Sequence, residues 1–229
     1  MKERKNRYGI LLLAGEGNRA KTESGIQKQF VKLNGKEIFL YPLETMLASN
    51  LFTKIILVCN EKKLSNVNEI ITNKEKKFLS IIECIKGGKT RNESVFNALR
   101  YLYDNGVEDS IVFIHDAARA CLPIEVLMSL DAYSEEYDAI TPIYPVSDSL
   151  MKNDVYIDRE SVMSVQTPQV FKIQKLLKIY TDNMFIDNST DDFGKAQKAN
   201  LKCLTIKGSP FLMKITYPED INMMKKLLR

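Results

Sequence analysis

Short apolar runs alternate with longer segments of helical periodicity, and this alternation constrains the fold more than any other feature of the chain. The runs are rich in Ile, Leu and Val, as expected for strands buried on both faces. They comprise residues Tyr8 to Leu13, Lys54 to Cys59, Leu79 to Ile85, Ser110 to His115, Ala139 to Tyr144 and Leu201 to Ile206. The sequence therefore predicts an α/β fold in which a twisted, mostly parallel sheet is flanked by crossover helices.

Segments with helical spacing lie between or after these runs. They comprise residues Ile38 to Ala48, Ser65 to Asn73, Arg91 to Asp104, Ile124 to Tyr133, Ile173 to Asn183 and Pro218 to Leu228. Thr90 or Asn92 is positioned to cap the third of these helices. Pro218 occupies a first-turn position of the last helix. Acidic residues follow it and basic residues close the helix, a distribution of charge that suits the helix dipole: Glu219, Asp220, Lys225, Lys226 and Arg229.

The stretch at about 145–169 interrupts this alternation of predicted strands and helices. It contains polar clusters and two short alternating runs around Asn153-Asp154. We interpret it as a hairpin excursion from the main sheet. Because no repeat or linker is evident, the sequence predicts a single domain over residues 1–229 with an arm.

Composition excludes several classes of protein. The chain has 229 residues, 45% of them hydrophobic and 27% charged, which argues against disorder, a collagen-like chain or a coiled rod. Its 33 Lys and Arg against 29 Asp and Glu leave a formal net charge of +4. That excess fits a local basic cluster better than the broad basic face of a nucleic-acid binder. We therefore expect no nucleic-acid partner.

Cysteine usage and hydropathy indicate the compartment. The four cysteines are scattered without a C-x-x-C pair, and a single His argues against a zinc site. The apolar stretch after the basic N-terminus is too short for a secretory signal, and no segment reaches the roughly 18 apolar residues of a membrane span. We expect reduced thiols, no membrane partner and a cytoplasmic location.

The strongest local motif follows the first apolar run. Gly15 and Gly17 would let the backbone turn sharply and bring N–H groups close to an anion, while Arg19 and Lys28 can neutralise phosphate charge. The motif has neither the Gly-Lys-Ser/Thr of a P-loop nor the third glycine of a dinucleotide fingerprint. An ordinary strand-to-helix turn is the alternative. We interpret the motif as a triphosphate-binding loop.

Two further turns follow apolar runs. After the third run, Gly88 would admit a base or ribose edge and Ser94 could bond a nucleotide, although an ordinary capped turn is equally consistent. Asp116 follows the fourth run, where it could meet a metal ion or a ribose. His115 is expected to make a structural hydrogen bond. Because the carboxyl ends of parallel strands share one edge of a sheet, the three turns should converge on a nucleotide site.

Eight short motifs follow one another along almost the whole chain. They are Leu13-Ala14-Gly15-x-Gly17-x-Arg19, Lys28-Gln29-Phe30 with Gly35-Lys36, Gly87-Gly88-x-x-Arg91-x-x-Ser94-Val95, His115-Asp116-Ala117-Ala118-Arg119, Pro145-Val146-x-Asp148-Ser149, Gln166-Thr167-Pro168-Gln169-x-Phe171, Thr190-Asp191-Asp192 and Lys214-Ile215-Thr216-x-Pro218-Glu219-Asp220. In order and spacing they resemble the 2-C-methyl-D-erythritol 4-phosphate cytidylyltransferases of isoprenoid biosynthesis and the related ribitol 5-phosphate cytidylyltransferases. The run from His115 to Arg119 is more similar to the erythritol enzymes.

This resemblance implies a Rossmann-like nucleotidyltransferase that uses CTP and a polyol phosphate. A substrate phosphate oxygen would attack the α-phosphorus of CTP, pyrophosphate would leave, and Mg²⁺ or another divalent cation would take part. The arm at about 145–169 would join two subunits into a homodimer. In the family the arm reaches the neighbouring subunit's site, so Ser149 and Arg159 would act in trans.

The resemblance also implies a role for individual residues. Arg19 and Lys28 would stabilise the charged transition state, while Arg159 and Lys214 would hold the acceptor phosphate as part of the catalytic set. The residues expected to bind CTP are Leu13, Ala14, Gly15, Gly17, Gly88, Ser94 and Ala117. The residues expected to bind the acceptor are Ser149, Arg159, Lys214, Asp116 and Arg119. Asp116 is also the candidate metal ligand.

Two other functions stay open at the level of the sequence. One is the same chemistry on ribitol 5-phosphate or another polyol phosphate, for wall or capsule synthesis. The other is a catalytically weak, nucleotide-binding regulatory protein, because Ala20 and Gln27 depart from the residues usual in the family's loop. The cytidylyltransferase that acts on 2-C-methyl-D-erythritol 4-phosphate is the leading interpretation.

Overall fold

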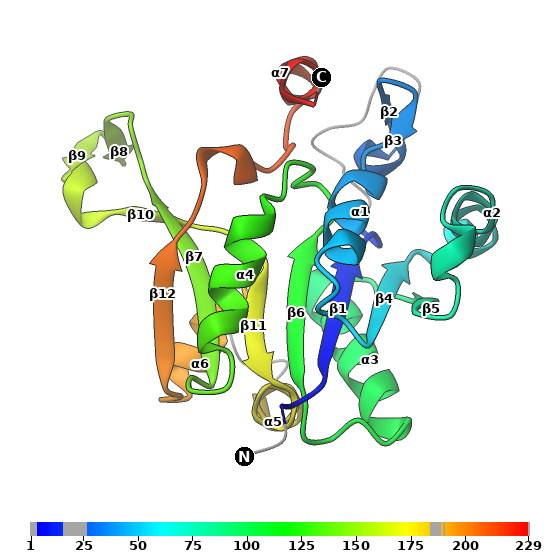
Figure 1. The fold of residues 1–229 in the computed structure, drawn as a ribbon. Coiled ribbons are helices and arrows are strands. Elements are labelled where there is room, and N and C mark those ends of the chain that lie inside the picture. Colours follow the sequence, from blue (N-terminus) through cyan, green and yellow to red (C-terminus); the bar gives the residue numbers. More distant parts are fainter. Residues whose placement is uncertain (1–3, 16–26, 184–188, 190, 229) are drawn as a thin grey trace.

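An eight-stranded twisted sheet forms the centre of the molecule, with strand order β10-β7-β11-β6-β1-β4-β5 and with β12 paired to β7 (Figure 1). The computed structural model describes residues 4–15, 27–183, 189 and 191–228. Six strands run in parallel: β1 (Arg7–Leu12), β4 (Lys54–Cys59), β5 (Ile82–Lys86), β6 (Ile111–Asp116), β7 (Ala139–Pro145) and β12 (Cys203–Lys207). The fold is the expected α/β sheet flanked by helices.

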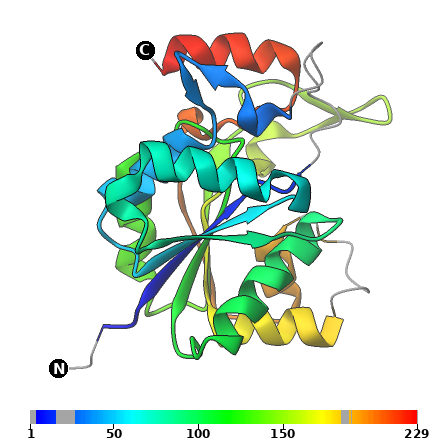
Figure 2. The same ribbon diagram turned by 90° about the vertical axis from the view of Figure 1, so that its right-hand side faces the viewer.

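Helices cover both faces of the sheet (Figures 1 and 2). One face carries α1 (Leu40–Ala48), α2 (Leu64–Lys74) and α4 (Ile124–Tyr133). The other carries α3 (Arg91–Asp104), α5 (Ile173–Asn183) and α6 (Asp192–Lys198). The C-terminal helix α7 (Pro218–Leu227) lies beside a small hairpin of β2 (Lys32–Leu33) and β3 (Lys36–Glu37) (Figure 2).

Strand β6 shows why the runs are apolar throughout. Ile111 and Phe113 point into the core beneath α1 and α4, whereas Val112 and Ile114 point into the core beneath α3 and α5. All four side chains are fully buried. Because successive side chains of a strand point to opposite faces, a strand covered on both sides needs apolar residues at every position.

Most of the expected elements form close to their expected bounds. The helices α3, α4 and α5 begin and end where the spacing predicts. Thr90 is the residue that caps α3, because its side chain accepts a hydrogen bond from the backbone N–H of Glu93. Strand β5 begins at Ile82 rather than Leu79, since the chain just before it, Lys76–Phe78, forms a short 3-10 turn.

The small β2–β3 hairpin was not anticipated from the sequence, nor were three elements of the main sheet and its covering helices. Strands β10 (Met163–Val165) and β11 (Gln169–Lys172) join the main sheet antiparallel to their neighbours, and α6 follows in the chain. β11 lies between β6 and β7 in the sheet. β10, β11 and α6 have three, four and seven residues, too few to show a period in the sequence.

The arm contains a hairpin of β8 (Leu150–Lys152) and β9 (Val155–Ile157). Its turn is Asn153-Asp154, with φ of 50° and 62°, values that Asn and Asp tolerate better than other non-glycine residues. The hairpin extends away from the sheet (Figures 1 and 2). Within the described part of the chain, no helix has the length and apolar character that crossing a membrane requires.

Candidate active site

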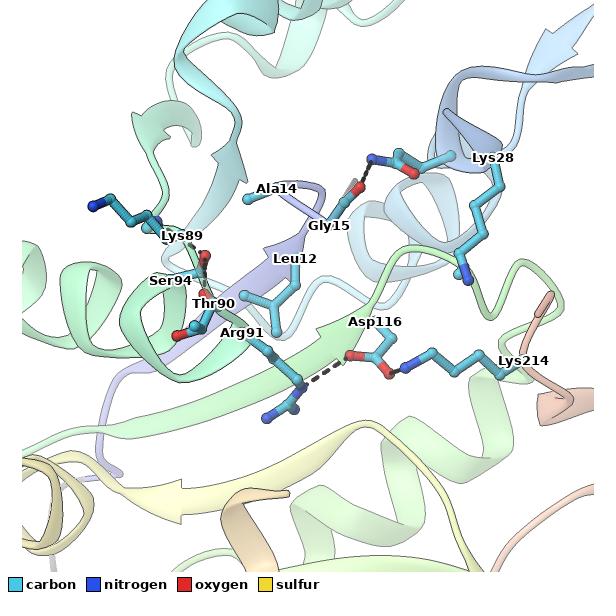
Figure 3. A pocket seen from close by; sticks show the side chains of 13 residues that line it. Leu12, Ala14, Gly15, Lys28, Lys89, Thr90, Arg91, Ser94, Asp116 and Lys214 are labelled. Atoms are coloured by element: carbon cyan, nitrogen blue, oxygen red, sulfur yellow. Dashed lines mark hydrogen bonds and ion pairs between the residues drawn. The ribbon is translucent and has the colours of Figure 1, made fainter. Parts of the chain in front are cut away.

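A pocket of about 250 Å³ opens at the carboxyl ends of β1 and β6 (Figure 3). The chain leaves β1 for β4 and β5 on one side and returns to β6 on the other, so this edge is the switch point where open α/β sheets bind ligands. Its walls come from four segments that are far apart in the sequence. The lining residues are Leu12, Ala14, Gly15, Lys28, Gln29, Gly88, Lys89, Thr90, Arg91, Ser94, Asp116, Ala118 and Lys214.

The loop after β1 is fixed by a buried side chain. The amide of Gln29 donates to the carbonyl oxygens of Leu13, at 2.6 Å, and Gly15, at 2.8 Å. The backbone N–H of Leu13 in turn donates to the carbonyl of Val58 on the neighbouring strand. Gln29 therefore positions the start of the glycine loop. Leu13 anchors the backbone and does not itself line the pocket.

The second wall is the start of α3. The Ser94 hydroxyl accepts from the backbone N–H of Gly88 at 3.0 Å and donates to the carbonyl of Thr90 at 2.9 Å. Thr90, Arg91 and Ser94 all line the pocket, so the N-terminus of the helix faces it. Unpaired N–H groups and the helix dipole at such an end favour an anionic ligand.

Asp116 forms the floor of the pocket and carries a cluster of charges (Figure 3). Its carboxylate accepts from Lys214 Nζ at 2.6 Å and from Arg91 Nε at 3.4 Å. Burial acts to raise the pKa of Asp116, but the charges of Arg91, Lys214 and Arg119 outweigh it and hold that pKa well below its usual range. Asp116 is therefore an anion shared by several cations at neutral pH.

Two cationic side chains reach the pocket from opposite ends of the chain (Figure 3). Lys28 follows the β1 loop, and its Nζ donates to the backbone carbonyl of Ile215 at 2.5 Å. Lys214 precedes Ile215 and donates to Asp116. The C-terminal segment therefore brings both ammonium groups to the same cavity, where they can offset negative charge on a bound ligand.

A second cavity of about 450 Å³ adjoins the first. The two share Arg91, Asp116 and Lys214 in their linings. Arg119 lines only the second cavity, and its guanidinium donates to the carbonyl of Leu212 at 2.5 Å. Thr167 lines it as well. The arrangement offers adjoining spaces for two ligands that meet at Asp116.

His115 makes a structural contact beside the site, as expected. The carbonyl of Arg119 can only accept, so the contact of 3.1 Å to His115 Nε2 assigns the proton to that nitrogen. Nδ1 then accepts from the Thr167 hydroxyl at 2.9 Å, and the Thr167 oxygen accepts from the backbone N–H of Asp116 at 3.2 Å. His115 thus ties together the turn that presents Asp116 and Arg119.

We expect this contact to make stability depend on pH. Burial lowers the pKa of His115 from 6.5 to about 4, so the unfolded chain binds a proton below pH 6.5 that the folded protein does not. The neutral imidazole is stabilising above that pH, and the free energy of unfolding should fall by about 2 kcal/mol between pH 7 and pH 5 on this account. Urea unfolding at both pH values measures the loss. His115→Gln should lack this part of the pH dependence, and an identical slope in that variant would contradict the assignment.

The residues expected from the sequence fall into distinct groups. Those that line the first pocket are Ala14, Gly15, Lys28, Gly88, Ser94, Asp116 and Lys214, while Arg119 lines the second cavity. The backbone N–H of Ala117 donates to the carbonyl of Leu12, and Ala117 lines neither cavity. Gly17 and Arg19 lie outside the described residues.

Two expected residues lie on the arm. Ser149 and Arg159 line neither cavity, and Arg159 donates to the carbonyl of Ser147 within the arm itself. The β8–β9 hairpin beside them projects from the β7 side of the sheet (Figure 1).

Sequence reasoning missed the roles of Gln29, Arg91 and Thr167. All three stand in motifs that carry the family resemblance, and that was the only sequence signal available for them. Their importance depends on partners at least 14 residues away. Gln29 bonds to Gly15 and Leu13, and Arg91 bonds to Asp192, which is 101 residues distant.

A glycine loop, a helix N-terminus and a cluster of cations at the switch point of a doubly wound sheet define a nucleotide-binding enzyme of the nucleotidyltransferase class. The sequence model of the 2-C-methyl-D-erythritol 4-phosphate cytidylyltransferases (IspD) matches residues 8–229. The chain therefore belongs to this family, and it is a CTP-dependent transferase by class.

Individual relatives agree with this membership. A 2-C-methyl-D-erythritol 4-phosphate cytidylyltransferase of Thermotoga neapolitana is 31% identical over 224 residues, which cover 96% of each chain. The structure of the bifunctional IspDF from Campylobacter jejuni is 28% identical with a TM-score of 0.78, over 95% of this chain and 53% of that one. The chain thus spans about half of that bifunctional relative. A 4-diphosphocytidyl-2C-methyl-D-erythritol synthase, 22% identical with a TM-score of 0.82, has the same fold.

The two loops of the nucleotide pocket are packed against each other at Gly87, and we expect Gly87→Ala to weaken CTP binding. An added Cβ would lie 2.6 Å from the Cβ of Ala14 and 3.0 Å from the Ser94 hydroxyl, so one loop must move. Overpacking of this kind costs about 1–3 kcal/mol. A cost of about 1.4 kcal/mol to the binding conformation of the loops raises the Kd for CTP, measured by calorimetry, roughly tenfold. Adding Ala14→Gly removes the closest atom and should restore part of the affinity. Unchanged CTP affinity in Gly87→Ala would contradict the packing argument.

Proposed function

We infer that this chain transfers CMP from CTP to 2-C-methyl-D-erythritol 4-phosphate, with release of pyrophosphate, in isoprenoid precursor biosynthesis. Membership of the family supports this inference. The structural observation that carries it is the pair of adjoining cavities that meet at Asp116, with Lys28 and Lys214 beside them. One cavity has the glycine loop and helix N-terminus suited to a triphosphate, and the other has Arg119 and polar groups suited to a polyol phosphate.

The chemistry requires alignment and charge compensation more than proton transfer. An oxygen of the acceptor phosphate forms a bond to the α-phosphorus of CTP, and the bond from that phosphorus to the bridging oxygen breaks, so the electron pair leaves with pyrophosphate. A phosphate monoester has a second pKa of about 6 and is already largely ionised at neutral pH. No general base is needed, in line with a neutral, hydrogen-bonded His115.

The cationic side chains of the site would act on different phosphate groups. Lys28 stands with the nucleotide loop, so we propose that it offsets charge on the α-phosphate and the leaving group, together with Arg19. Lys214 and Arg119 would bind the acceptor phosphate. Asp116 would accept hydrogen bonds from the acceptor's hydroxyl groups and keep Lys214 in place. Gly88 and Ser94 would contact the nucleoside.

We propose that a divalent cation, Mg²⁺, accompanies the triphosphate. Within residues 4–15, 27–183, 189 and 191–228, no group of three or more His, Cys, Asp or Glu side chains could hold a metal ion. Asp116 is the one carboxylate that lines the first pocket among the described residues. One carboxylate plus substrate phosphates is a usual set of ligands for Mg²⁺. The cation would neutralise triphosphate charge, and Asp116 is its protein ligand in this proposal.

We propose that two copies of the chain pair through the arm at about 145–169, so that Ser149 and Arg159 serve the partner's site. Met151, Val155 and Tyr156 on this arm are 55%, 66% and 73% exposed, an apolar surface suited to contact with another chain. The dimer would also explain why the arm residues line neither cavity of their own chain. The four free cysteines agree with the proposed cytoplasmic location.

Mixing two inactive variants tests the arrangement in trans. In a heterodimer of Lys28→Ala with Arg159→Ala, one site has both changes and the other has none. Equal mixing after unfolding and refolding should therefore restore about a quarter of wild-type activity. Light scattering should report a dimer. A monomer, or a mixture no more active than its components, would overturn the proposal.

The proposed activity itself is tested by incubating the protein with CTP, Mg²⁺ and 2-C-methyl-D-erythritol 4-phosphate and following pyrophosphate release. Ribitol 5-phosphate is assayed in parallel. Faster turnover of ribitol 5-phosphate would reassign the acceptor. CTP binding without turnover of either acceptor would favour a regulatory nucleotide-binding protein and refute the enzyme assignment for this chain.

A further inference from the structure

Two residues that have no role in the reaction described above, Arg91 and Asp192, meet in the structure. Arg91 is the first residue of α3, and Asp192 is the first residue of α6. The Arg91 guanidinium donates through Nη1 to the Asp192 carboxylate at 2.7 Å. Asp192 is completely buried, and its second oxygen accepts a hydrogen bond from the Tyr180 hydroxyl. The ion pair therefore joins two helix starts at the edge of the sheet.

Arg91 also reaches the floor of the site. Its Nε lies 3.4 Å from the Asp116 carboxylate, on the side opposite the 2.6 Å contact from Lys214 (Figure 3). Arg91 and Asp116 line both cavities, so this contact lies at the boundary between the two expected ligands. The Asp116 carboxylate is thus held between a cation fixed by α6 and a cation from the C-terminal segment.

The geometry favours an indirect role for Arg91. Its remaining nitrogen, Nη2, is inaccessible to solvent and makes no hydrogen bond within the described structure, so it is not a donor that a ligand in either cavity can reach. Nη1 is committed to Asp192. Arg91 can therefore influence a ligand chiefly through Asp116, whose position it constrains.

We propose that Arg91, anchored by Asp192, is a positioning residue that holds the Asp116 carboxylate in the orientation that receives the polyol phosphate acceptor. This inference rests on the proposed cytidylyl transfer. Asp116 presents its oxygens where the two cavities meet, and Arg91 and Lys214 fix it from two sides. Loosening the Arg91–Asp192 pair should weaken productive binding of the acceptor more than binding of CTP, because CTP has contacts at the glycine loop and α3 in addition to the cation that Asp116 would hold.

Two variants separate positioning from folding. Asp192→Asn keeps the size of the side chain and can still accept from Tyr180, but it removes the charge that anchors Arg91. The double variant Arg91→Met with Asp192→Asn removes both charges and leaves no unpaired buried ion, which favours retention of the fold. The matched control is Arg100→Met with Asp104→Asn, an exposed pair on the same helix α3 at 3.8 Å.

The readout is the Michaelis constant for each substrate. We expect the KM for the acceptor to rise on the order of tenfold or more in both variants, while the KM for CTP changes less than about threefold. The control pair should leave both constants unchanged. Thermal unfolding by circular dichroism checks that the variants are folded. A general loss of folded protein would lower the apparent kcat without separating the two constants.

The outcomes of this experiment are distinct. Acceptor kinetics equal to wild type in the folded double variant would overturn the positioning role, and so would equal increases in the two KM values. The assay uses whichever polyol phosphate the wild-type protein turns over, so a different acceptor overturns the proposed substrate and leaves this test intact. A wild-type protein that turns over no polyol phosphate overturns both proposals.

Discussion

Lys28→Ala is expected to lower kcat by at least about a hundredfold, the usual effect of removing a single electrostatic stabiliser of a transition state. Lys28 reaches the first pocket beside the glycine loop and is held by the backbone carbonyl of Ile215. Charge on the α-phosphate and the leaving oxygens grows as the bond to phosphorus changes, so loss of the ammonium should affect kcat more than the KM for CTP. Steady-state pyrophosphate release measures both constants.

The control for this variant is Lys32→Ala. Lys32 is an exposed lysine four residues further along, and its ammonium pairs with Glu37 at 3.5 Å outside the pocket. It should retain wild-type kcat. If Lys28→Ala and Lys32→Ala had the same kcat, the position of the Lys28 ammonium in the pocket would not matter for turnover. Lys28 would then have no part in the chemical step.

Lys214→Met is expected to lower kcat/KM for the acceptor by about a hundredfold, because truncating one member of a charge pair in a ligand site costs about 2–5 kcal/mol. Methionine preserves the aliphatic stem and removes the ammonium that contacts Asp116 at 2.6 Å. The acceptor phosphate would lose a counter-charge, and Asp116 would lose the nearer of the two cations, Lys214 and Arg91, that contact it among the described residues. Acceptor titrations at saturating CTP measure the effect.

Lys207→Met is a suitable comparison for Lys214→Met, since Lys207 is the exposed last residue of β12 and lines neither cavity. It should keep wild-type kinetics. CTP affinity should stay within about threefold of wild type in both variants, since the nucleotide contacts of the glycine loop are intact. A Lys214→Met enzyme that lost CTP affinity and retained the acceptor's kcat/KM would reverse the assignment of the two cavities.

Much of the sheet could be predicted because its signal is local. Each long strand is an apolar run, and each long helix has apolar residues at helical spacing. The first and last residues of α3, α4 and α5 were therefore predicted correctly without any tertiary information. The short strand β11 was missed because four residues carry no period. Its antiparallel place between β6 and β7 is a matter of long-range pairing.

The sequence predicted which turns form the site. The contacts between side chains within the site became known only from the tertiary structure. The rule that parallel strands end at one edge was enough to group Ala14, Gly88 and Asp116. The sequence contained no reason for Arg91 to meet Asp192, or for Gln29 to hold the loop before it, because such contacts depend on side-chain directions across the sheet edge.

By itself the amino-acid sequence determined the α/β class, the main strands and helices and the family, because apolar periodicity and motif order are properties of the linear chain. The tertiary structure alone decided which charges share a cavity. Lys28 and Lys214 are separated by 186 positions, and they lie together only because the segment after β12 returns across the carboxyl end of β6. The strength of an electrostatic interaction depends on distance in space and on burial, and neither is written in the order of residues.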